Sequence, residues 1–484
     1  MPRSASRSSG AATAGTATAR AAVATAGTAA DPPRQGPHQR TGWRPLALTT
    51  IDPMDYQDAV AALYARMPTR MGPSLERISH LMELLDHPER TAPAVHLTGT
   101  NGKTSTARMV AALLAAFDVG AGIYTSPHLQ DVRERLALAT RPISTEEFAE
   151  TSTYLQPFLA EVDRAHDQPV TFHEVLTAMA FTWFAELPVD AQVIEVGMGG
   201  SWDATNLVHG DVAVINRVGL DHPELGDTPV AVAGEKAGII KQGATVVSQA
   251  QDDDVLAVID QRAASLDATV LLEGRDFGVE RRRQAVGGQV LDLRTPTGTV
   301  TEVLVPLHGR HQADNAAGAL MAVEAFLGGR RLDADAVRSG FATVTSPGRL
   351  EVVSRKPLVV LDGAHNPAGA RALAAALLEE FVVDRRILVV ACLADKDLRG
   401  ILEGLAPAIG RLVLTTNHSP RAAPAERLRK EAEALGLVAE TAPDVATAVG
   451  RAIDSAAETE AVVVTGSLHT VGEARDLLLG PGPA

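Results

Sequence analysis

The pattern of apolar and polar positions divides the chain into an unpatterned start and a long, regularly patterned remainder. From residue 51 onward, short β-branched and aliphatic runs alternate with longer amphipathic stretches. The amphipathic stretches predict helices, including Thr104–Phe117 and Glu174–Glu186. Strands that alternate with helices predict a parallel sheet covered on both faces. The strands predicted from the apolar runs are Ala94–Thr98, Gln192–Val196, Val212–Ile215 and Ala244–Ser248.

The same alternation starts again after Ser346-Pro347-Gly348, a turn-forming segment that is typical of a hinge. The pattern therefore predicts two domains, 51–345 and 346–484, and the second is the smaller. Its predicted strands are Leu358–Leu361, Ile387–Ala391, Arg411–Thr415 and Ala461–Thr465, and a helix is expected at Ala368–Phe381.

Residues 1–50 differ from the rest, because they consist of Ala, Thr, Ser, Gly and Pro with scattered Arg and have no apolar period. This composition predicts a disordered tail. Two alternatives stay open: a targeting peptide without the apolar core of a secretory signal, or a reading frame that begins too early, with the true start near Met54.

Composition and charge argue against several classes of function and location. Lys and Arg number 44 against 59 Asp and Glu, which gives a net charge of -15 and argues against nucleic acid as a partner. No apolar run is long enough to cross a membrane. Cys392 is the single cysteine, so a disulfide within the chain is excluded and a cytoplasmic location is expected.

The strongest chemical motif follows the first predicted strand and opens a helix. Glycines at this junction let backbone N–H groups point at phosphate oxygens, and the helix N-terminus adds positive potential. Lys103 supplies a mobile cation, and the hydroxyl of Thr104 can approach Mg2+. The loop is shorter than the common phosphate-loop pattern, and it lacks the G-x-G-x-x-G spacing of a dehydrogenase. Its residues are Gly99, Thr100, Asn101, Gly102, Lys103, Thr104 and Ser105.

This shorter loop resembles that of the Mur ligase superfamily, and further segments narrow the resemblance to the folylpolyglutamate synthase and dihydrofolate synthase branch. Arg70–Ile78 is similar to the N-terminal helix of that branch. The resemblance covers about residues 54 to 480. The other segments that carry it are Tyr124–Leu129, Arg133–Arg135, Glu195–Gly200, Asp203–Asn206, Gly234–Ile240, His311–Ala316, Ser346–Glu351 and Asp362–Pro367.

The resemblance implies an α/β fold of Mur ligase architecture. A P-loop-type parallel-sheet ATPase domain is expected at 51–345, followed by a smaller Rossmann-like glutamate-ligase domain at 346–484. It implies ATP-dependent ligation of L-glutamate to dihydropteroate, to a folate γ-carboxylate, or to both, through an acyl phosphate. We favour both activities. The expected cofactors are ATP and Mg2+ at two sites, with K+ as a further ion, and a monomer is expected.

Four residues are expected on the metal side of the site. Glu195 ends an apolar strand, where a carboxylate is well placed for Mg2+. The resemblance adds Ser126, His222 and Lys236, the last as a carbamate formed with CO2. Without the resemblance, Ser126 and His222 are ordinary loop residues, and Lys236 can equally pair with Glu235.

The resemblance assigns the remaining site residues to ATP and to the two substrates. Asn315, Arg349 and Asp362 are expected to contact ATP together with the phosphate loop. The catalytic residues expected are Lys103, Lys236, Asp362 and His365. The residues expected on the substrates are Thr171, Asp203 and Ala204 for the pterin, and His365 and Ser467 for glutamate.

The chain departs from the family pattern at several positions around the expected substrate pocket. Ser201-Trp202 replaces the usual Arg-Leu, His173 replaces an aromatic residue, and Pro223 follows His222, where Thr is common. Two alternative functions stay open: another Mur-type amide ligase, or a nucleotide-binding regulator without ligase activity. The first usually carries an additional N-terminal domain, and the second has no need of residues that hold an amino acid.

Overall fold

The computed structural model describes residues 52–68, 72–220 and 222–480. The predicted tail at 1–50 lies outside these residues, as do Arg70 and Met71 of the family-like segment. None of the helices in the described residues combines the length and the hydropathy that crossing a membrane requires.

A large mixed sheet forms the first part of the fold, in the order β4-β3-β2-β5-β1-β6-β7-β8. Strands β2, β5, β1, β6, β7 and β8 run parallel, and β3 and β4 add an antiparallel edge. The predicted parallel sheet is confirmed, but this edge was not anticipated. The strands are β1 (Ala94–Thr98), β2 (Ala121–Tyr124), β3 (Leu136–Leu138), β4 (Arg141–Pro142), β5 (Ala191–Glu195), β6 (Gly210–Ile215), β7 (Thr245–Ser248) and β8 (Thr269–Leu272).

Helices cover both faces of this sheet, because side chains of successive strand residues point to opposite faces. Val193 of β5 packs in one cluster with Leu113 and Leu320, whereas its neighbour Ile194 packs in another with Phe181. The helices of this part are α1 (Tyr56–Tyr64), α2 (Glu76–Leu84), α3 (Lys103–Ala116), α4 (Thr145–Ala165), α5 (Phe172–Glu186), α6 (Pro229–Lys236), α7 (Asp253–Ala264), α8 (Arg310–Phe326) and α9 (Ala334–Ala342).

The helix expected from the family-like segment Arg70–Ile78 is shorter than predicted. Helix α2 begins at Glu76, and the N–H of Glu76 donates to the Ser74 side chain at 3.1 Å. Gly72 and Pro73 precede it outside any helix. Glycine weakens a helix and proline suits only its first turn, so the helix starts after them.

A three-stranded antiparallel sheet was not anticipated from the sequence. It consists of β9 (Gly278–Ala285), β10 (Gly288–Thr295) and β11 (Gly298–Val305), in the order β11-β10-β9. Leu291 and Val303 anchor one face of it in the core beside α8. Strand β9 carries three successive arginines, Arg281, Arg282 and Arg283, so the apolar signal that marks a buried strand is weak here.

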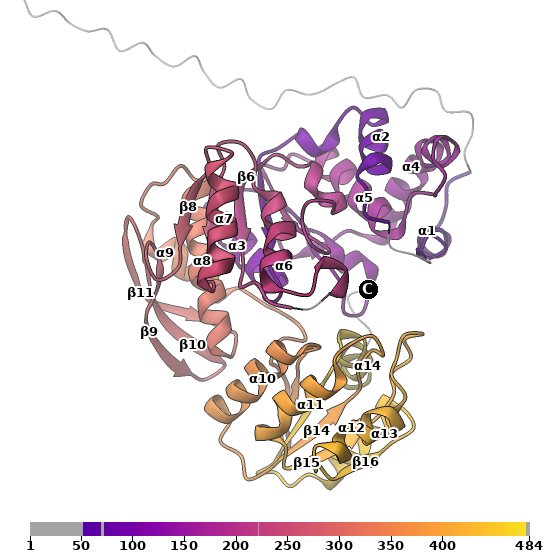
Figure 1. The fold of residues 1–484 in the computed structure, drawn as a ribbon, viewed down its shortest axis with the longest axis vertical. Coiled ribbons are helices and arrows are strands. Elements are labelled where there is room, and N and C mark those ends of the chain that lie inside the picture. The colour runs from indigo at the N-terminus through magenta and orange to yellow at the C-terminus, as the bar shows by residue number, and fades with distance from the viewer. Residues whose placement is uncertain (1–51, 69–71, 221, 481–484) are drawn as a thin grey trace, which may run out of the picture. The chain divides into compact units, whose positions relative to one another are not determined.

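A six-stranded sheet forms the last part of the fold, in the order β12-β13-β17-β14-β15-β16, with only β12 antiparallel (Figure 1, orange to yellow). Helices on both faces make it a Rossmann-like α/β unit, as predicted. The strands are β12 (Glu351–Arg355), β13 (Leu358–Leu361), β14 (Arg386–Val390), β15 (Arg411–Leu414), β16 (Ala439–Thr441) and β17 (Ala461–Thr465). The helices are α10 (Pro367–Glu380), α11 (Leu398–Leu405), α12 (Ala425–Ala434), α13 (Val445–Ser455) and α14 (Leu468–Leu479).

Candidate active site

The predicted phosphate loop joins the end of β1 to the first turn of α3, at the carboxyl edge of the parallel sheet. Gly99 and Gly102 have φ angles of +144° and +83°. A Cβ atom on Gly99 would lie 2.6 Å from the Asn216 side chain, and one on Gly102 would lie 2.6 Å from Asn315 Oδ1. Both positions therefore require glycine, and the backbone can approach a phosphate without side chains in the way.

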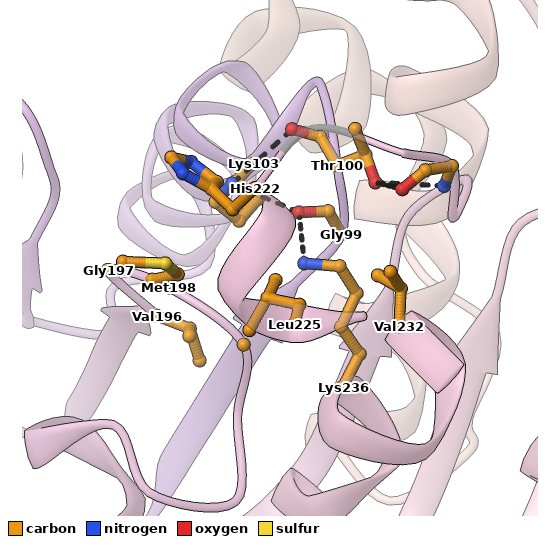
Figure 2. Close-up of a pocket in the computed structure, with 12 residues that line it drawn as sticks. Gly99, Thr100, Lys103, Val196, Gly197, Met198, His222, Leu225, Val232 and Lys236 are labelled. Carbon is orange, nitrogen blue, oxygen red and sulfur yellow. Dashed lines mark hydrogen bonds between the residues drawn. The ribbon is translucent and has the colours of Figure 1, made fainter. Parts of the chain in front are cut away.

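Two predicted lysines converge on this loop from different helices. Lys103 Nζ donates to the main-chain oxygen of Gly99 at 3.0 Å, and Lys236 Nζ donates to the same oxygen at 2.9 Å. Figure 2 shows both contacts around a small cavity of about 10 Å³, which His222 also lines. Lys236 is only 4% exposed. Folding thus brings Lys103, Lys236 and His222 together, as the resemblance implied.

Glu195 lies at the end of β5 and is 1% exposed. Its Oε1 accepts a hydrogen bond from Thr104 Oγ1 at 3.0 Å, and its Oε2 accepts one from the Ser126 N–H at 3.2 Å. Burial raises the pKa of Glu195, although the charge of Lys103 favours the ionised form. A buried carboxylate beside two hydroxyl-bearing residues is the all-oxygen donor set that Mg2+ prefers, so these residues fit that metal.

A chain of buried polar side chains links the phosphate loop to the predicted hinge. Asn315 accepts from Gln249 Nε2 at 2.9 Å and donates to Gln312 Oε1 at 3.0 Å. Gln312 donates to Ser105 Oγ at 3.1 Å, and Ser105 shares a hydrogen bond of 3.0 Å with Ser346 Oγ. Ser105 therefore points into this chain, whereas Thr104 points to Glu195. The sequence reasoning missed the roles of Gln249 and Gln312, although Gln312 lies in a family-like segment.

The second sheet contributes Asp362 directly after β13. Its two carboxylate oxygens accept the N–H groups of Leu350 and Ala364, each at 2.9 Å, so Asp362 fixes the turn that carries His365. The next residue, Asn366, donates to Asn101 Oδ1 of the phosphate loop at 3.0 Å. The second sheet is thus tied directly to the phosphate loop.

Arg349 and Ser467 flank this turn. The Arg349 guanidinium packs against Gly363, where a Cβ atom would lie 2.3 Å from its Nη1. Arg349 also acts on Glu195, whose ionised form its charge favours. Ser467 is 3% exposed and caps α14, because its Oγ accepts the N–H of His469 at 3.2 Å.

The predicted pterin-side residue Asp203 is 2% exposed and is already surrounded by donors of the protein. Oδ1 accepts from the Thr205 N–H and hydroxyl, and Oδ2 accepts from the Met198 N–H at 2.9 Å and His173 Nε2 at 3.2 Å. Burial alone would raise the pKa of Asp203, but these donors, His173 first, hold it well below its usual range. Asp203 is therefore an ionised anchor of its own loop.

Thr171 and Ala204 lie on the elements that flank Asp203. Thr171 caps α5 in a capping box, in which both its N–H and its hydroxyl donate to Glu174 Oε2, at 2.7 and 2.8 Å. Ala204 opens a single helical turn and is 5% exposed. These residues set the shape of the region more than they offer free polar groups.

An aromatic and cationic cluster beside α5 was missed, although two of its members lie in family-like segments. Arg135 Nε donates to His128 Nδ1 at 2.9 Å, and the Arg135 guanidinium lies 5.2 Å from the centre of the Phe172 ring. The Tyr64 ring lies 5.2 Å from the same phenyl ring. Burial lowers the pKa of His128 to about 3, so this histidine is neutral and can accept from Arg135.

Comparison with known proteins defines the class first. Residues 97–323 match the Mur ligase middle domain, and residues 348–468 match the Mur ligase glutamate ligase domain. The two matches together cover the phosphate loop, Glu195, Lys236, Asp362 and the first residue of α14. The fold is therefore that of a Mur ligase.

Individual relatives are more specific. The dihydrofolate synthase/folylpolyglutamate synthase of Mycobacterium tuberculosis is 44% identical over 84% of this chain and 91% of its own. The solved folylpolyglutamate synthase of that organism in complex with ADP has a TM-score of 0.84 and 44% identity, over 89% of this chain and 98% of its own. A solved complex named for folylpolyglutamate synthase, AMPPCP and folate has a TM-score of 0.78 and 32% identity, over 88% and 100%.

The chain belongs to the dihydrofolate synthase/folylpolyglutamate synthase family. The family, the fold class and the enzyme class, an ATP-dependent ligase, are confirmed as predicted. The roles of individual site residues and the exact domain boundaries stay predictions.

Proposed function

We propose that the chain uses ATP to join L-glutamate to dihydropteroate and to the γ-carboxylate of a reduced folate. The observation that carries this proposal is the position of Glu195. Its buried carboxylate lies between Thr104 of the phosphate loop and the Ser126 N–H, in a chain of this family. A phosphoryl-transfer site with a metal-binding carboxylate is what activation of a carboxylate by ATP requires.

The reaction has two balanced steps. An acceptor carboxylate oxygen attacks the γ-phosphorus of ATP, the bond to the β-phosphate oxygen breaks, and ADP leaves with an acyl phosphate formed. The amine of glutamate then attacks the acyl carbon, loses a proton and displaces phosphate. The chain holds the phosphates in line with the acceptor carboxylate and brings the amine close to the acyl carbon. Each bimolecular step thereby becomes a reaction within one complex.

ATP is bound in this proposal by both parts of the fold. The N–H groups of the phosphate loop and the N-terminus of α3 receive the phosphates, and Lys103 moves from the Gly99 oxygen onto them. Asn315, Arg349 and Asp362 hold the rest of the nucleotide. The contact between Asn366 and Asn101 supports a site assembled from the two sheets.

Glu195, Ser126 and His222 would hold one Mg2+, and a carbamylated Lys236 would hold a second. When bound, Mg2+ neutralises phosphate oxygens. The Lys236 ammonium has no lone pair for a metal, whereas its carbamate is a carboxylate-like oxygen donor. The buried position of Lys236 beside the loop supports this assignment. K+ is a further ion of the proposal.

The two substrates lie on opposite sides of the phosphate loop in this proposal. Thr171, Asp203 and Ala204 line the pterin side, where the His173–Asp203 pair replaces an aromatic contact. His365 and Ser467, on the second sheet, hold the incoming glutamate. The protein acts as a cytoplasmic monomer, which suits a chain with a single cysteine, Cys392.

The test measures ADP release with Mg2+ and L-glutamate, with either dihydropteroate or tetrahydrofolate as acceptor. Turnover with both acceptors is expected. We expect Lys103→Met to lower kcat at least about 100-fold, because it removes a cation that stabilises the transferring phosphoryl group. Lys430→Met, at an exposed lysine of α12, is the matched control. ATP binding without turnover on either acceptor would contradict the proposal.

A further inference from the structure

A second cavity, of about 230 Å³, is lined in part by the phosphate-loop helix α3. Its walls come from α3, from β2 and β3, from the segment before the predicted hinge, and from α14. Ala112, Ile123, Ala137 and Val344 make one wall apolar, whereas Arg108 and Arg475 supply guanidinium groups. A cavity with an apolar wall and a few convergent polar groups is the usual form of a small-molecule site.

Among residues 52–68, 72–220 and 222–480, neither a hydrogen bond nor an ion pair reaches the Arg108 guanidinium in this cavity. The Arg108 side chain is partly buried. Burial lowers the pKa of Arg108, and the charges of Arg349 and Arg475 act in the same direction. An unpaired, desolvated guanidinium is costly, so its five donors favour a carboxylate that enters the cavity.

The other charged groups of the cavity are already satisfied. The Glu134 carboxylate accepts three backbone N–H groups, from Leu129, Gln130 and Asp131, each at 2.9 Å. Arg475 donates to both carboxylate oxygens of Glu351, at 3.1 and 3.2 Å. The charge left for a ligand is therefore that of Arg108.

Helix geometry sets Arg108 next to the reaction centre. Arg108 follows Thr104 by four residues in α3, so both side chains project from one face of the helix. Thr104 donates to Glu195, and the charges of Glu195 and Glu134 stabilise the Arg108 cation. The cavity thus opens within one helical turn of the residues proposed to activate the acceptor carboxylate.

The two acceptors of the proposed reaction differ in the number of carboxylates at the end that reacts, and a cation can distinguish between these carboxylates. Dihydropteroate ends in one carboxylate, whereas a folate ends in a glutamate that bears an α- and a γ-carboxylate. Only the γ-carboxylate is to be phosphorylated, so the α-carboxylate has to be held away from ATP. Resting on the proposed function, we propose that this cavity receives the terminal glutamyl residue of folate acceptors and that Arg108 binds its α-carboxylate. The apolar wall accommodates the methylene groups.

The test compares the two acceptors in Arg108→Gln, in Arg108→Lys and in Arg399→Gln, a control at an exposed arginine of α11. For Arg108→Gln, kcat/KM with tetrahydrofolate falls about 10- to 100-fold, the usual effect of losing a charge-assisted bidentate pair. Arg108→Lys recovers part of this loss, because lysine keeps the positive charge but cannot form the two parallel hydrogen bonds that a guanidinium makes with a carboxylate. With dihydropteroate, kcat/KM stays within about twofold, which also reports that the variant is folded.

A second readout is the linkage of the product. NMR of the glutamylated folate made by Arg108→Gln shows a fraction joined through the α-carboxylate, whereas the unchanged chain gives only the γ-linked product. Equal losses with both acceptors would assign Arg108 to the phosphate loop or to folding and overturn the proposal. A raised KM for L-glutamate with dihydropteroate would assign the cavity to the incoming amino acid and overturn it too. Failure of the unchanged chain on both acceptors would instead defeat the proposed function.

Discussion

Lys103 and Lys236 donate to the same acceptor, the main-chain oxygen of Gly99, at 3.0 and 2.9 Å. One lysine comes from the first turn of α3 and the other from the last turn of α6. Two ammonium groups that share one carbonyl oxygen repel each other. Loss of the charge on Lys236, or movement of Lys103 onto a phosphate, relieves this repulsion. The charge on Lys236 therefore affects whether Lys103 stays on the Gly99 oxygen or is released to bind a phosphate.

The first prediction concerns Lys236. If Lys236 acts as a carbamate, Lys236→Ala lowers ADP release at least about 100-fold, as removal of a metal ligand at a phosphoryl-transfer site does. A short carboxylic acid such as propionate restores part of the activity, because it supplies the missing oxygens. Lys236→Arg is expected to stay inactive, since arginine keeps the charge but does not form a carbamate. Full activity of Lys236→Arg would show that the positive charge is enough.

The second prediction concerns Glu195 and the metal. Glu195→Gln preserves an acceptor for Thr104 but removes the negative charge, so the Mg2+ concentration for half-maximal ADP release rises at least about tenfold. Because burial raises the pKa of Glu195, apparent Mg2+ affinity also weakens as pH falls, earlier than for an ordinary carboxylate. Glu403→Gln, at an exposed site in α11, is the control. An unchanged Mg2+ dependence would remove Glu195 from the metal site.

The third prediction concerns the contact between the small antiparallel sheet and α10. Glu380 is 3% exposed, and it accepts from His308 Nδ1 and the Gly309 N–H, each at 2.8 Å, and from Arg282. Glu380→Ala leaves the His308 ring nitrogen and the Gly309 N–H without their acceptor, and it removes one of the two carboxylates that pair with Arg282. It is therefore expected to cost about 3 kcal/mol of unfolding free energy, measured by urea denaturation.

The neighbouring residue offers a matched control for that measurement. Glu379 contacts the same Arg282, but its side chain is 46% exposed. Glu379→Ala is therefore expected to cost less than about 1 kcal/mol, as exposed ion pairs do. Equal effects of the two substitutions would mean that burial does not control this contact.

The fourth prediction concerns pH. Burial, with Asp314 nearby, raises the pKa of Glu273 from 4.5 to about 7. Below pH 4.5 the group is protonated in both folded and unfolded chains, and its contribution to stability is fully present. Between pH 4.5 and about 7 the unfolded chain is ionised while the folded chain stays protonated, so this stability is lost progressively as pH rises through that range.

Glu273→Gln keeps an acceptor for the Ala250 N–H but cannot ionise. The variant is expected to have a higher Tm than the unchanged chain at about pH 8 and a similar Tm at about pH 4. Thermal unfolding followed by circular dichroism at the two pH values makes the comparison. A lower Tm for the variant at the higher pH would mean that the Glu273 charge is stabilising.

Much of the fold was predictable from local pattern, because a buried strand and an amphipathic helix each carry their own periodicity. Strands β1, β13 and β17 have the predicted bounds, and β5, β6, β7, β14 and β15 lie within a few residues of them. The antiparallel sheet β9–β11 was missed. Arginines such as Arg282 break its apolar alternation, and the carboxylates that pair with Arg282 lie in α10, far along the chain.

The phosphate loop and Glu195 were predictable because each motif is contiguous: glycines, lysine and hydroxyl follow a strand, and a carboxylate ends one. Only the folded structure shows which distant residues contact these groups. Lys236 reaches Gly99 from 137 residues away, and Asp203 is already occupied by its own loop. The cavity at Arg108 exists only because α3, β2, β3, the segment before the hinge and α14 come together in the fold. Contacts between distant segments depend on how elements pack, and a short sequence pattern carries no record of that packing.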